Sequence, residues 1–164
     1  MNAKKLTTLS LSVALSLILS FVESHIPPLA AVPGVKIGLA NIITVFLLYT
    51  YGAWHAGAVS VVRVLLSSLL FGSALSLLYS LSGSVVSFLI MITLKKVRIF
   101  SEVGVSIAGG VFHNAAQIAC AALVMESAAI ALYLPALIIS GTLAGVAVGI
   151  AAAILIRRLG ARVK

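Results

Sequence analysis

The sequence predicts an all-α integral membrane protein, with six transmembrane helices in a single membrane domain over residues 1–164 and with both termini in the cytoplasm. Composition is the first reason: 62% of the residues are hydrophobic, only 9% are charged, and the mean hydropathy is +1.27. Soluble domains carry about 25% charged residues, so this chain lacks the polar side chains that would cover a water-exposed surface. Long apolar stretches recur from end to end and indicate helices that cross a lipid bilayer.

The placement of the basic residues is the second reason, and it also indicates the orientation. Lys and Arg number 11 against 3 acidic residues, which gives a net charge of +8. Most of these basic residues stand at the ends of apolar runs, as they do in cytoplasmic loops of membrane proteins. We therefore expect the lipid bilayer, and no nucleic acid, as a partner. The clusters are Lys4 and Lys5; Lys95, Lys96 and Arg98; and Arg157 and Arg158.

The predicted spans follow the apolar runs in order. They are expected at about 5–22, 36–52, 54–78, 81–95, 103–125 and 132–156. The breaks between them are Pro27, Pro28 and Pro33; Gly52; Ser82 and Gly83; the 95–98 cluster; and residues 126–135. The first run has the basic start of a signal peptide, but no small-x-small cleavage pattern follows directly, which favours an uncleaved helix.

The span count has an alternative, because the fourth run is short. The alternative is that residues 71–84 form a broken connection, which would leave five spans. Six spans place all three basic clusters on the cytoplasmic side, whereas five would place one of them outside, so topology favours six. The residues then expected near the outer mouth are Glu23, His25, Lys36 and Glu126.

Two expected helices carry ridges of small residues spaced by four. One comprises Thr8, Ser12, Ser16 and Ser20, and the other comprises Gly141, Gly145 and Gly149. Small residues at this spacing let helix backbones approach closely in lipid. Packing within the chain and docking of another membrane subunit are both consistent with each ridge.

Arg63 lies about 14 Å into the third expected span, near the middle of the membrane. An arginine at that depth is costly and faces an interior cavity or a partner. The three acids, Glu23, Glu102 and Glu126, are all expected near the membrane surfaces. Backbone carbonyls, a glutamate reached by helix tilt and an anionic ligand therefore remain alternatives for the partner of Arg63.

Further polar residues at membrane depth complete the candidate substrate site. His113, Asn114 and Gln117 share one helix face because they are three and four residues apart. An interhelical hydrogen-bond network and a ligand site are equally consistent with them. Lys36 and Asn41 enter the second span, where Lys36 opposes the helix dipole. Extension to the lipid headgroups and contact with a ligand are the two alternatives for Lys36. We expect these residues to converge with Arg63.

The sequence also lacks the motifs of several enzyme classes. It has no phosphate-binding P-loop, no GxSxG motif and no aspartate, so neither ATP hydrolysis by that route nor an aspartate-rich magnesium–diphosphate site is expected. Its single cysteine, Cys120, and its scattered histidines do not have metal-ligand spacing. We therefore expect a protein that is not an enzyme and that has no cofactor or metal.

Several stretches resemble a known family. "PGVKIGLANI", Arg63, "FSEVGVSIAGGVFHNAAQ" and "YLPALIISGTLAGVAVG" together resemble the Gx-transporter family, which is also labelled heptaprenyl diphosphate synthase component I. The wider group is similar to the S components of energy-coupling-factor (ECF) transporters. This resemblance implies a six-helix bundle that binds a substrate from outside and docks onto a transmembrane coupling subunit with ATPases. The small-residue ridge that begins at Thr8 resembles their docking feature, with Thr and Ser in place of Ala.

The function expected from these features is that of a substrate-binding membrane component of an energy-coupled transporter, in the plasma membrane of a prokaryote. Its ligand would be a small molecule that is anionic, or isoprenoid- or quinone-related as the resemblance implies. The alternative is a non-catalytic membrane subunit associated with heptaprenyl diphosphate or quinone synthesis, or with quinone-linked electron transfer. In that alternative the buried polar residues would join helices to one another.

Overall fold

The computed structural model describes residues 3–25 and 38–163, and these residues form helices joined by short connections. The five longer helices, one of them continuous with a 3-10 turn, are long and apolar enough to cross a membrane, so the chain is a multi-pass membrane protein. The elements are α1 (Ala3–His25), α2 (Asn41–Thr50), α3 (Ala53–Phe71), α4 (Ala74–Val97), α5 (Glu102–Val124), the 3-10 helix η1 (Ala128–Tyr133) and α6 (Leu134–Val163).

Two of the helices begin at serine caps. The hydroxyl of Ser73 accepts a hydrogen bond from the backbone N–H of Ser76 (3.2 Å), and that of Ser101 accepts one from Gly104 (3.3 Å). A capping hydroxyl satisfies one of the N–H groups that a helix start leaves without an intrahelical partner. Glu102, in the first turn of α5, adds a negative charge where the helix dipole favours it.

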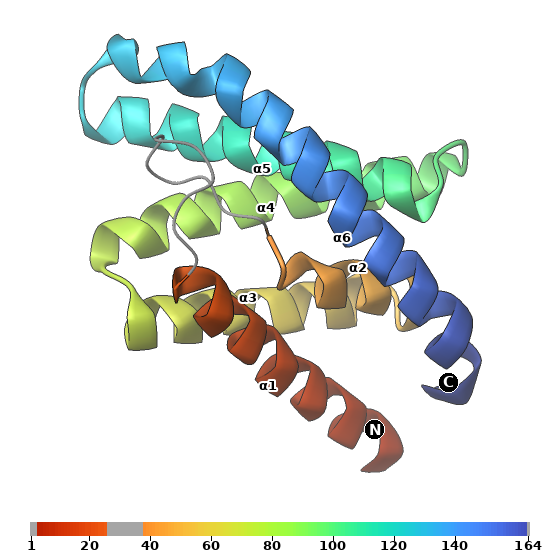
Figure 1. Cartoon of the computed structure of the whole chain (residues 1–164). Helices are drawn as coiled ribbons and strands as arrows, with labels where there is room; N and C mark the ends of the chain where they lie inside the picture. Colours follow the sequence, from red (N-terminus) through yellow and green to blue (C-terminus); the bar gives the residue numbers. More distant parts are fainter. Residues whose placement is uncertain (1–2, 26–37, 164) are drawn as a thin grey trace.

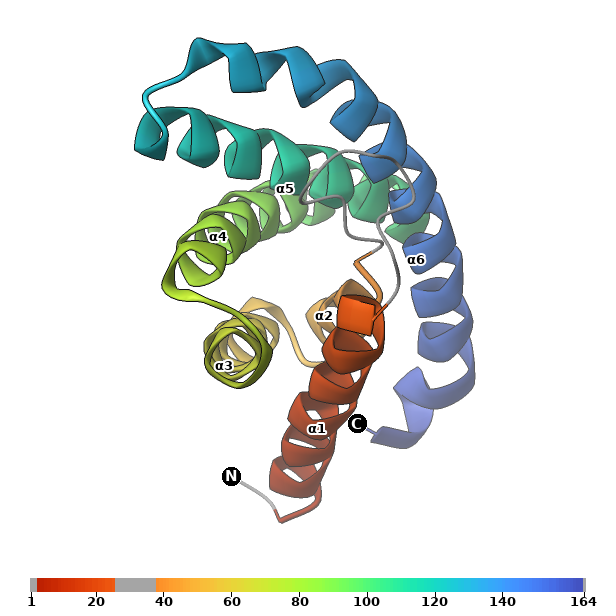
Figure 2. The ribbon, with the colours of Figure 1, turned by 60° about the vertical axis from the view of Figure 1, so that its left-hand side comes forward.

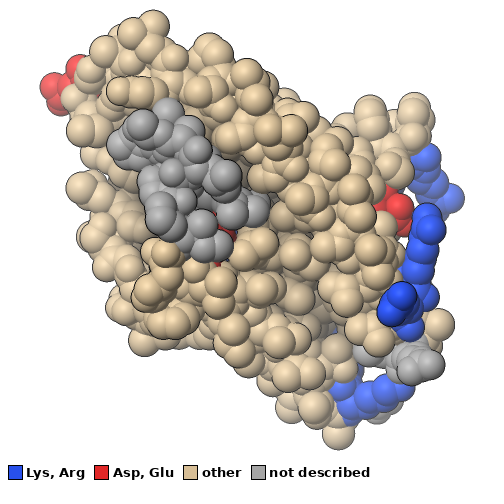
Figure 3. Space-filling model, viewed as in Figure 1, with Lys and Arg blue, Asp and Glu red and all other residues tan. Residues whose placement is uncertain are grey.

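The helices alternate in direction, so both termini lie at the same end of the bundle (Figure 1). The α2–α3 and α4–α5 connections also lie at this end, which we call the basic end. Figure 3 shows the Lys and Arg side chains of that face of the molecule gathered there. The α3–α4 connection, η1 and the last turn of α1 lie at the opposite end. The expected placement of the three basic clusters at one end agrees with this arrangement.

Pairwise helix contacts close a ring (Figure 2). In order, α2, α3, α4, α5 and α6 each contact the next, α6 contacts α2, and α1 packs across α3, α2 and α6. The hydrophobic core lies around α2, seven of whose ten residues are buried. A helix of this length is about 15 Å long, roughly half the thickness of a bilayer core. Because α2 fills only part of the ring, the interior toward the opposite end is left to polar side chains.

Helices α5 and α6 approach each other so closely at their glycines that a Cβ added there would overlap backbone atoms of the other helix. A Cβ added at Gly141 would lie 2.9 Å from the carbonyl oxygen of Gly110, and one at Gly145 would lie 2.6 Å from the Cα of Ile107. At Gly149 the corresponding distance, to the Cα of Val103, is 2.7 Å. The ridge of Gly141, Gly145 and Gly149 therefore lies against the backbone of α5, the arrangement that small residues permit in membrane helices.

The helix boundaries correct the sequence prediction at α3 and α4. The break expected at Ser82 and Gly83 is wrong: α4 runs through both residues, and the chain turns at Gly72 and Ser73 instead. Gly83 serves packing, since a Cβ there would lie 2.9 Å from Cγ of Gln117. Ser73 caps the start of α4, so the capping serine and not the glycine marks the boundary.

The second expected span, 36–52, also differs from the observed helix. Helix α2 begins at Asn41 and ends at Thr50, after a turn at Leu39 and Ala40. Lys36, Pro27, Pro28 and Pro33 lie outside the described residues. The described part of the chain thus contains one short apolar helix beside the five membrane-length ones.

Candidate functional site

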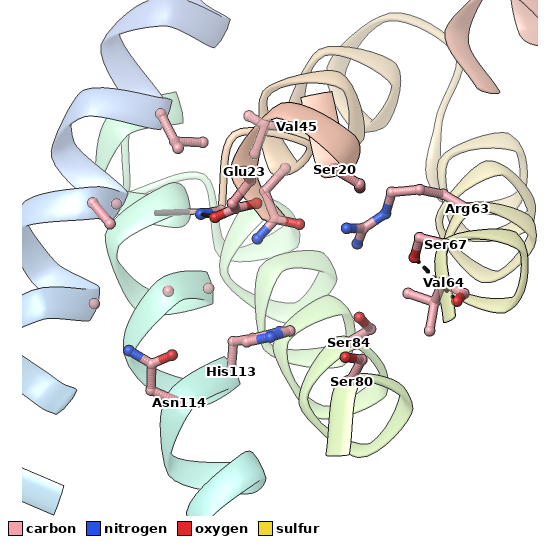
Figure 4. Close-up of a pocket in the computed structure, with 18 of the residues that line it drawn as sticks. Ser20, Glu23, Val45, Arg63, Val64, Ser67, Ser80, Ser84, His113 and Asn114 are labelled. Atoms are coloured by element: carbon pink, nitrogen blue, oxygen red, sulfur yellow. Dashed lines mark hydrogen bonds between the residues drawn. The ribbon is translucent and has the colours of Figure 1, made fainter. Parts of the chain in front are cut away.

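A cavity lies inside the helix ring, and all six α-helices contribute to its lining. Its volume is about 100 Å³, enough for several water molecules at roughly 10–15 Å³ each. Its charged and amide- or imidazole-bearing side chains come from α1, α2, α3 and α5, as Figure 4 shows in part. They are Glu23, Asn41, Arg63, His113 and Asn114.

Arg63 extends from the middle of α3 into this cavity (Figure 4). Its Nε atom is buried and has no hydrogen-bond partner among the described residues. Its charge interacts electrostatically with that of Glu23. Of the three alternatives for the partner of Arg63, the glutamate reached from another helix is the one that the structure brings near. The Nε–H donor nevertheless has no hydrogen-bond partner among the described residues, which is unusual for a buried polar atom.

Glu23 lies near the opposite end of the bundle and also lines the cavity. It is half-buried in the last turn of α1 and lines the cavity, where its Oε1 accepts a hydrogen bond from the backbone N–H of Gly38. Gly38 has a φ of 75°, a conformation that favours glycine. Glu23 thereby joins the end of α1 to the chain that enters α2, and it places a negative charge on the cavity wall.

Asn114 joins α5 to α6 and lines the cavity. Its Nδ2 donates a hydrogen bond of 2.8 Å to the carbonyl oxygen of Leu137, and the residue is only 4% exposed. Figure 4 shows His113 beside it on the same helix. The side chain of Asn114 therefore belongs to an interhelical hydrogen bond as well as to the cavity wall.

Replacing Asn114 with Ala is expected to lower the free energy of unfolding by about 1 kcal/mol, because interhelical hydrogen bonds in membranes contribute about that much. Unfolding in mixed micelles with increasing sodium dodecyl sulfate would measure it. Ser140→Ala is the matched control, since Ser140 donates a longer bond (3.2 Å) to the same Leu137 oxygen from within α6. Equal losses in the two variants would show that the α5–α6 bond contributes nothing of its own.

The other expected substrate residues divide into two groups. Asn41 lines the cavity from the first turn of α2. Gln117 does not line it: its side chain packs against Gly83 on α4. The structure thus brings Asn41, Arg63, His113 and Asn114 to one cavity, and Gln117 belongs to the contact between α4 and α5.

His25 and Glu126 lie at the opposite end of the bundle, as expected, but neither lines the cavity. Both are exposed, and Nδ1 of His25 lies 3.0 Å from the carbonyl oxygen of Phe21. Glu126 ends the α5 segment with a φ of 50°. Among the described residues, no group of three or more His, Cys, Asp or Glu side chains is placed to hold a metal ion.

The serine ridge of α1 faces the interior of the bundle. Ser12 is 6% exposed and Ser16 is 2% exposed, while Ser20 lines the cavity. Thr8 is half-buried at the start of the ridge. This burial agrees with the internal-packing alternative rather than with docking, since a docking face has to be accessible to the partner.

Sequence reasoning missed the serines of α3 and α4. Several serines of these two helices line the cavity, and the α4 serines among them are spaced by four residues, which puts them on one helix face. That spacing is the same signal that marked the α1 ridge, so the sequence did contain it. The missed lining residues are Ser67, Ser68, Ser76, Ser80 and Ser84.

The comparison with protein families covers this whole site. The family model described as heptaprenyl diphosphate synthase component I matches residues 12–155, from just before the middle of α1 almost to the end of α6. The chain belongs to the heptaprenyl diphosphate synthase component I family. No curated protein and no solved structure matched the chain. All the cavity-lining residues, from Ser20 to Val148, fall within the part that matches this component I family.

Proposed function

We propose that this component I family member is the substrate-binding membrane component of an energy-coupled transporter, similar in role to an ECF S component. The observation that carries the proposal is Arg63, a cation within a membrane-embedded cavity whose Nε donor has no partner among the described residues. An ionisable side chain inside the membrane is costly and is characteristic of substrate and ion pathways. A solute that accepts a hydrogen bond from Arg63 would satisfy this donor.

The proposed topology follows from the basic end. Basic residues near membrane helices favour the cytoplasm, so the termini and the α4–α5 connection would face the cytoplasm of a prokaryotic cell. Helix α2 would then belong to the second of six passes. Glu23 and Ser76 line the cavity near the opposite end of the bundle, so the ligand would enter from outside.

Transport would require partner subunits. The chain has no P-loop to bind ATP, so a transmembrane coupling subunit with ATPases would supply the energy. The docking face would lie elsewhere than on Ser12 and Ser16, because these are buried within the chain.

The binding proposal predicts that Arg63→Ala loses a bound solute that the unchanged protein retains. Native mass spectrometry of the protein released from detergent micelles would detect that solute, and we expect its occupancy to fall at least about tenfold with the loss of one charged hydrogen bond. Arg157→Ala is the control, since Arg157 is exposed at the basic end. Retention of the solute by a folded Arg63→Ala variant would contradict the assignment of the site.

The second candidate function is that of a non-catalytic membrane subunit of heptaprenyl diphosphate synthesis. The family match over residues 12–155 favours it, because the family description names a synthase component. In this case the chain would co-purify with a prenyl diphosphate synthase, and Arg63 and Glu23 would hold helices together. A ligand-free protein that assembles with the synthase equally well after Arg63→Lys replacement would support this function over transport.

A further inference from the structure

We infer that the cavity recognises the oxyanion, a carboxylate or a phosphate, of a compact hydrophilic solute, and that Arg63, Ser20 and Ser84 bind this group. The inference rests on the proposed binding function and specifies its ligand. It also excludes a prenyl chain as the group that occupies the cavity.

The first argument is that three buried polar atoms of the cavity wall have no partner in the described chain. They are the Nε of Arg63 and the hydroxyl oxygens of Ser20 and Ser84. They come from α3, α1 and α4, and Figure 4 shows all three side chains at the same cavity. Buried polar atoms without partners are rare in proteins, so three of them at one cavity indicate a group that satisfies them together.

The second argument is that Ser20 and Ser84 lack the hydrogen bond to the helix backbone that other serines of their helices make. Serines within helices ordinarily donate to a carbonyl three or four residues earlier. Ser16 does so to Val13 (2.8 Å), and Ser82 does so to Tyr79 (2.9 Å). Ser20 and Ser84 lie on the same two helices, one turn or less away, yet their hydroxyls make no such bond. Their O–H groups therefore remain available to a solute.

The chemistry of the three groups selects an acceptor. The Nε–H of arginine can only donate, while a hydroxyl donates or accepts. A carboxylate or phosphate can accept from all three, and hydrogen bonds between charged partners are shorter and stronger than neutral ones. Glu23 does not fill this role, because Nε remains without a bond even though the carboxylate interacts with the arginine electrostatically.

Further serine hydroxyls supply polar groups on the cavity wall. Ser76, Ser80 and Ser84 follow one face of α4 along the cavity, and Ser67 and Ser68 line it from α3. A prenyl chain would leave the buried hydroxyls of Ser20 and Ser84 without a bond, which is costly. The buried apolar residues of the wall are Val45, Val64, Met91 and Val148, and two of them, Val45 and Met91, belong to the hydrophobic core.

Binding of four probes to the full chain in detergent tests the inference: inorganic phosphate, succinate, farnesol and farnesyl diphosphate. We expect phosphate or succinate to raise the melting temperature and farnesol to leave it unchanged. Phosphate alone would indicate a phosphorylated solute, and succinate alone a carboxylate. Farnesyl diphosphate should bind no more tightly than phosphate, because the prenyl chain adds no favourable contact.

The double variant Ser20→Ala/Ser84→Ala should bind the anion at least about tenfold more weakly than the unchanged protein. Without ligand its melting temperature should not fall, because each removed hydroxyl has no partner. Ser10→Ala/Ser82→Ala is the matched control on the same two helices: Ser10 is exposed, and neither residue lines the cavity.

Binding of farnesol without either anion, or unchanged anion affinity in the double variant, would overturn the inference while leaving a ligand-binding protein. If none of the four probes binds, the chemistry of a solute that co-purifies with the protein tests the inference. A co-purifying solute that carries an oxyanion supports the inference, and a co-purifying solute without an oxyanion overturns it. Failure of the probes together with no co-purifying solute would overturn the proposed function itself.

Discussion

Replacing Gly145 with Ala is expected to lower the free energy of unfolding by about 3 kcal/mol, at the upper end of the range for overpacked sites. The added Cβ would lie 2.6 Å from the Cα of Ile107 and 3.0 Å from the carbonyl oxygen of Ser106. These are backbone atoms, so no side-chain rotation relieves the overlap, and α5 and α6 have to move apart. Unfolding in mixed micelles with increasing dodecyl sulfate would measure the loss.

Gly160→Ala is the matched control on the same helix. A Cβ there would lie 3.4 Å from Cγ2 of Thr50, an ordinary contact, and alanine favours a helix over glycine by about 0.5–1 kcal/mol. We expect this variant to be as stable as the unchanged protein or more stable. If both alanines had the same effect, the close α5–α6 approach would not be what requires glycine at residue 145.

Replacing Glu23 with Gln is expected to destabilise the protein by about 2 kcal/mol. Gln keeps the oxygen that accepts the Gly38 N–H but removes the charge that interacts with Arg63. A buried cation is then left without its opposite charge, which costs several kcal/mol at fully buried pairs. Glu23 is half-buried, so a smaller loss is expected here.

A double-mutant cycle separates this electrostatic effect from lost packing. Adding Arg63→Met to Glu23→Gln removes the uncompensated charge, so the double variant should regain most of the lost stability. Glu126→Gln serves as the control because that carboxylate is exposed, and it should have no measurable effect. A double variant whose two losses simply add would show that Glu23 and Arg63 stabilise the fold independently.

The helix content and the common end of the basic clusters could be predicted because both depend on composition along the chain. A run of about 20 apolar residues forms a helix in lipid whatever its neighbours are. The glycine ridge of α6 could also be recognised, because its spacing of four residues is local. The α3–α4 boundary could not: Gly83 looks like a breaker in the sequence, and only the packing of Gln117 against it shows why a glycine stands inside a helix.

In the candidate site, too, some residues could be recognised from the sequence, whereas the positions of others depend on how the helices pack. Arg63 was recognisable because a lone cation in an apolar run is conspicuous. Gln117 and His113 share a helix face and both pack against Gly83 of α4, yet only His113 also lines the cavity. Glu23 was expected near the outer mouth, and its electrostatic interaction with Arg63 could not be read from the sequence because the two residues lie on different helices. Such differences depend on how helices cross, which local spacing does not specify.

The sequence by itself determined that this protein is a bundle of membrane helices, with its basic residues at one end and a cation at mid-depth, because hydropathy and charge act on each segment separately. Only the tertiary structure decided that α2 is short, that a cavity lies beyond its first turn, and that hydroxyls from α1, α3 and α4 surround Arg63 there. The physical reason is that a cavity is the space that several packed helices leave between them, and no single helix encodes its wall.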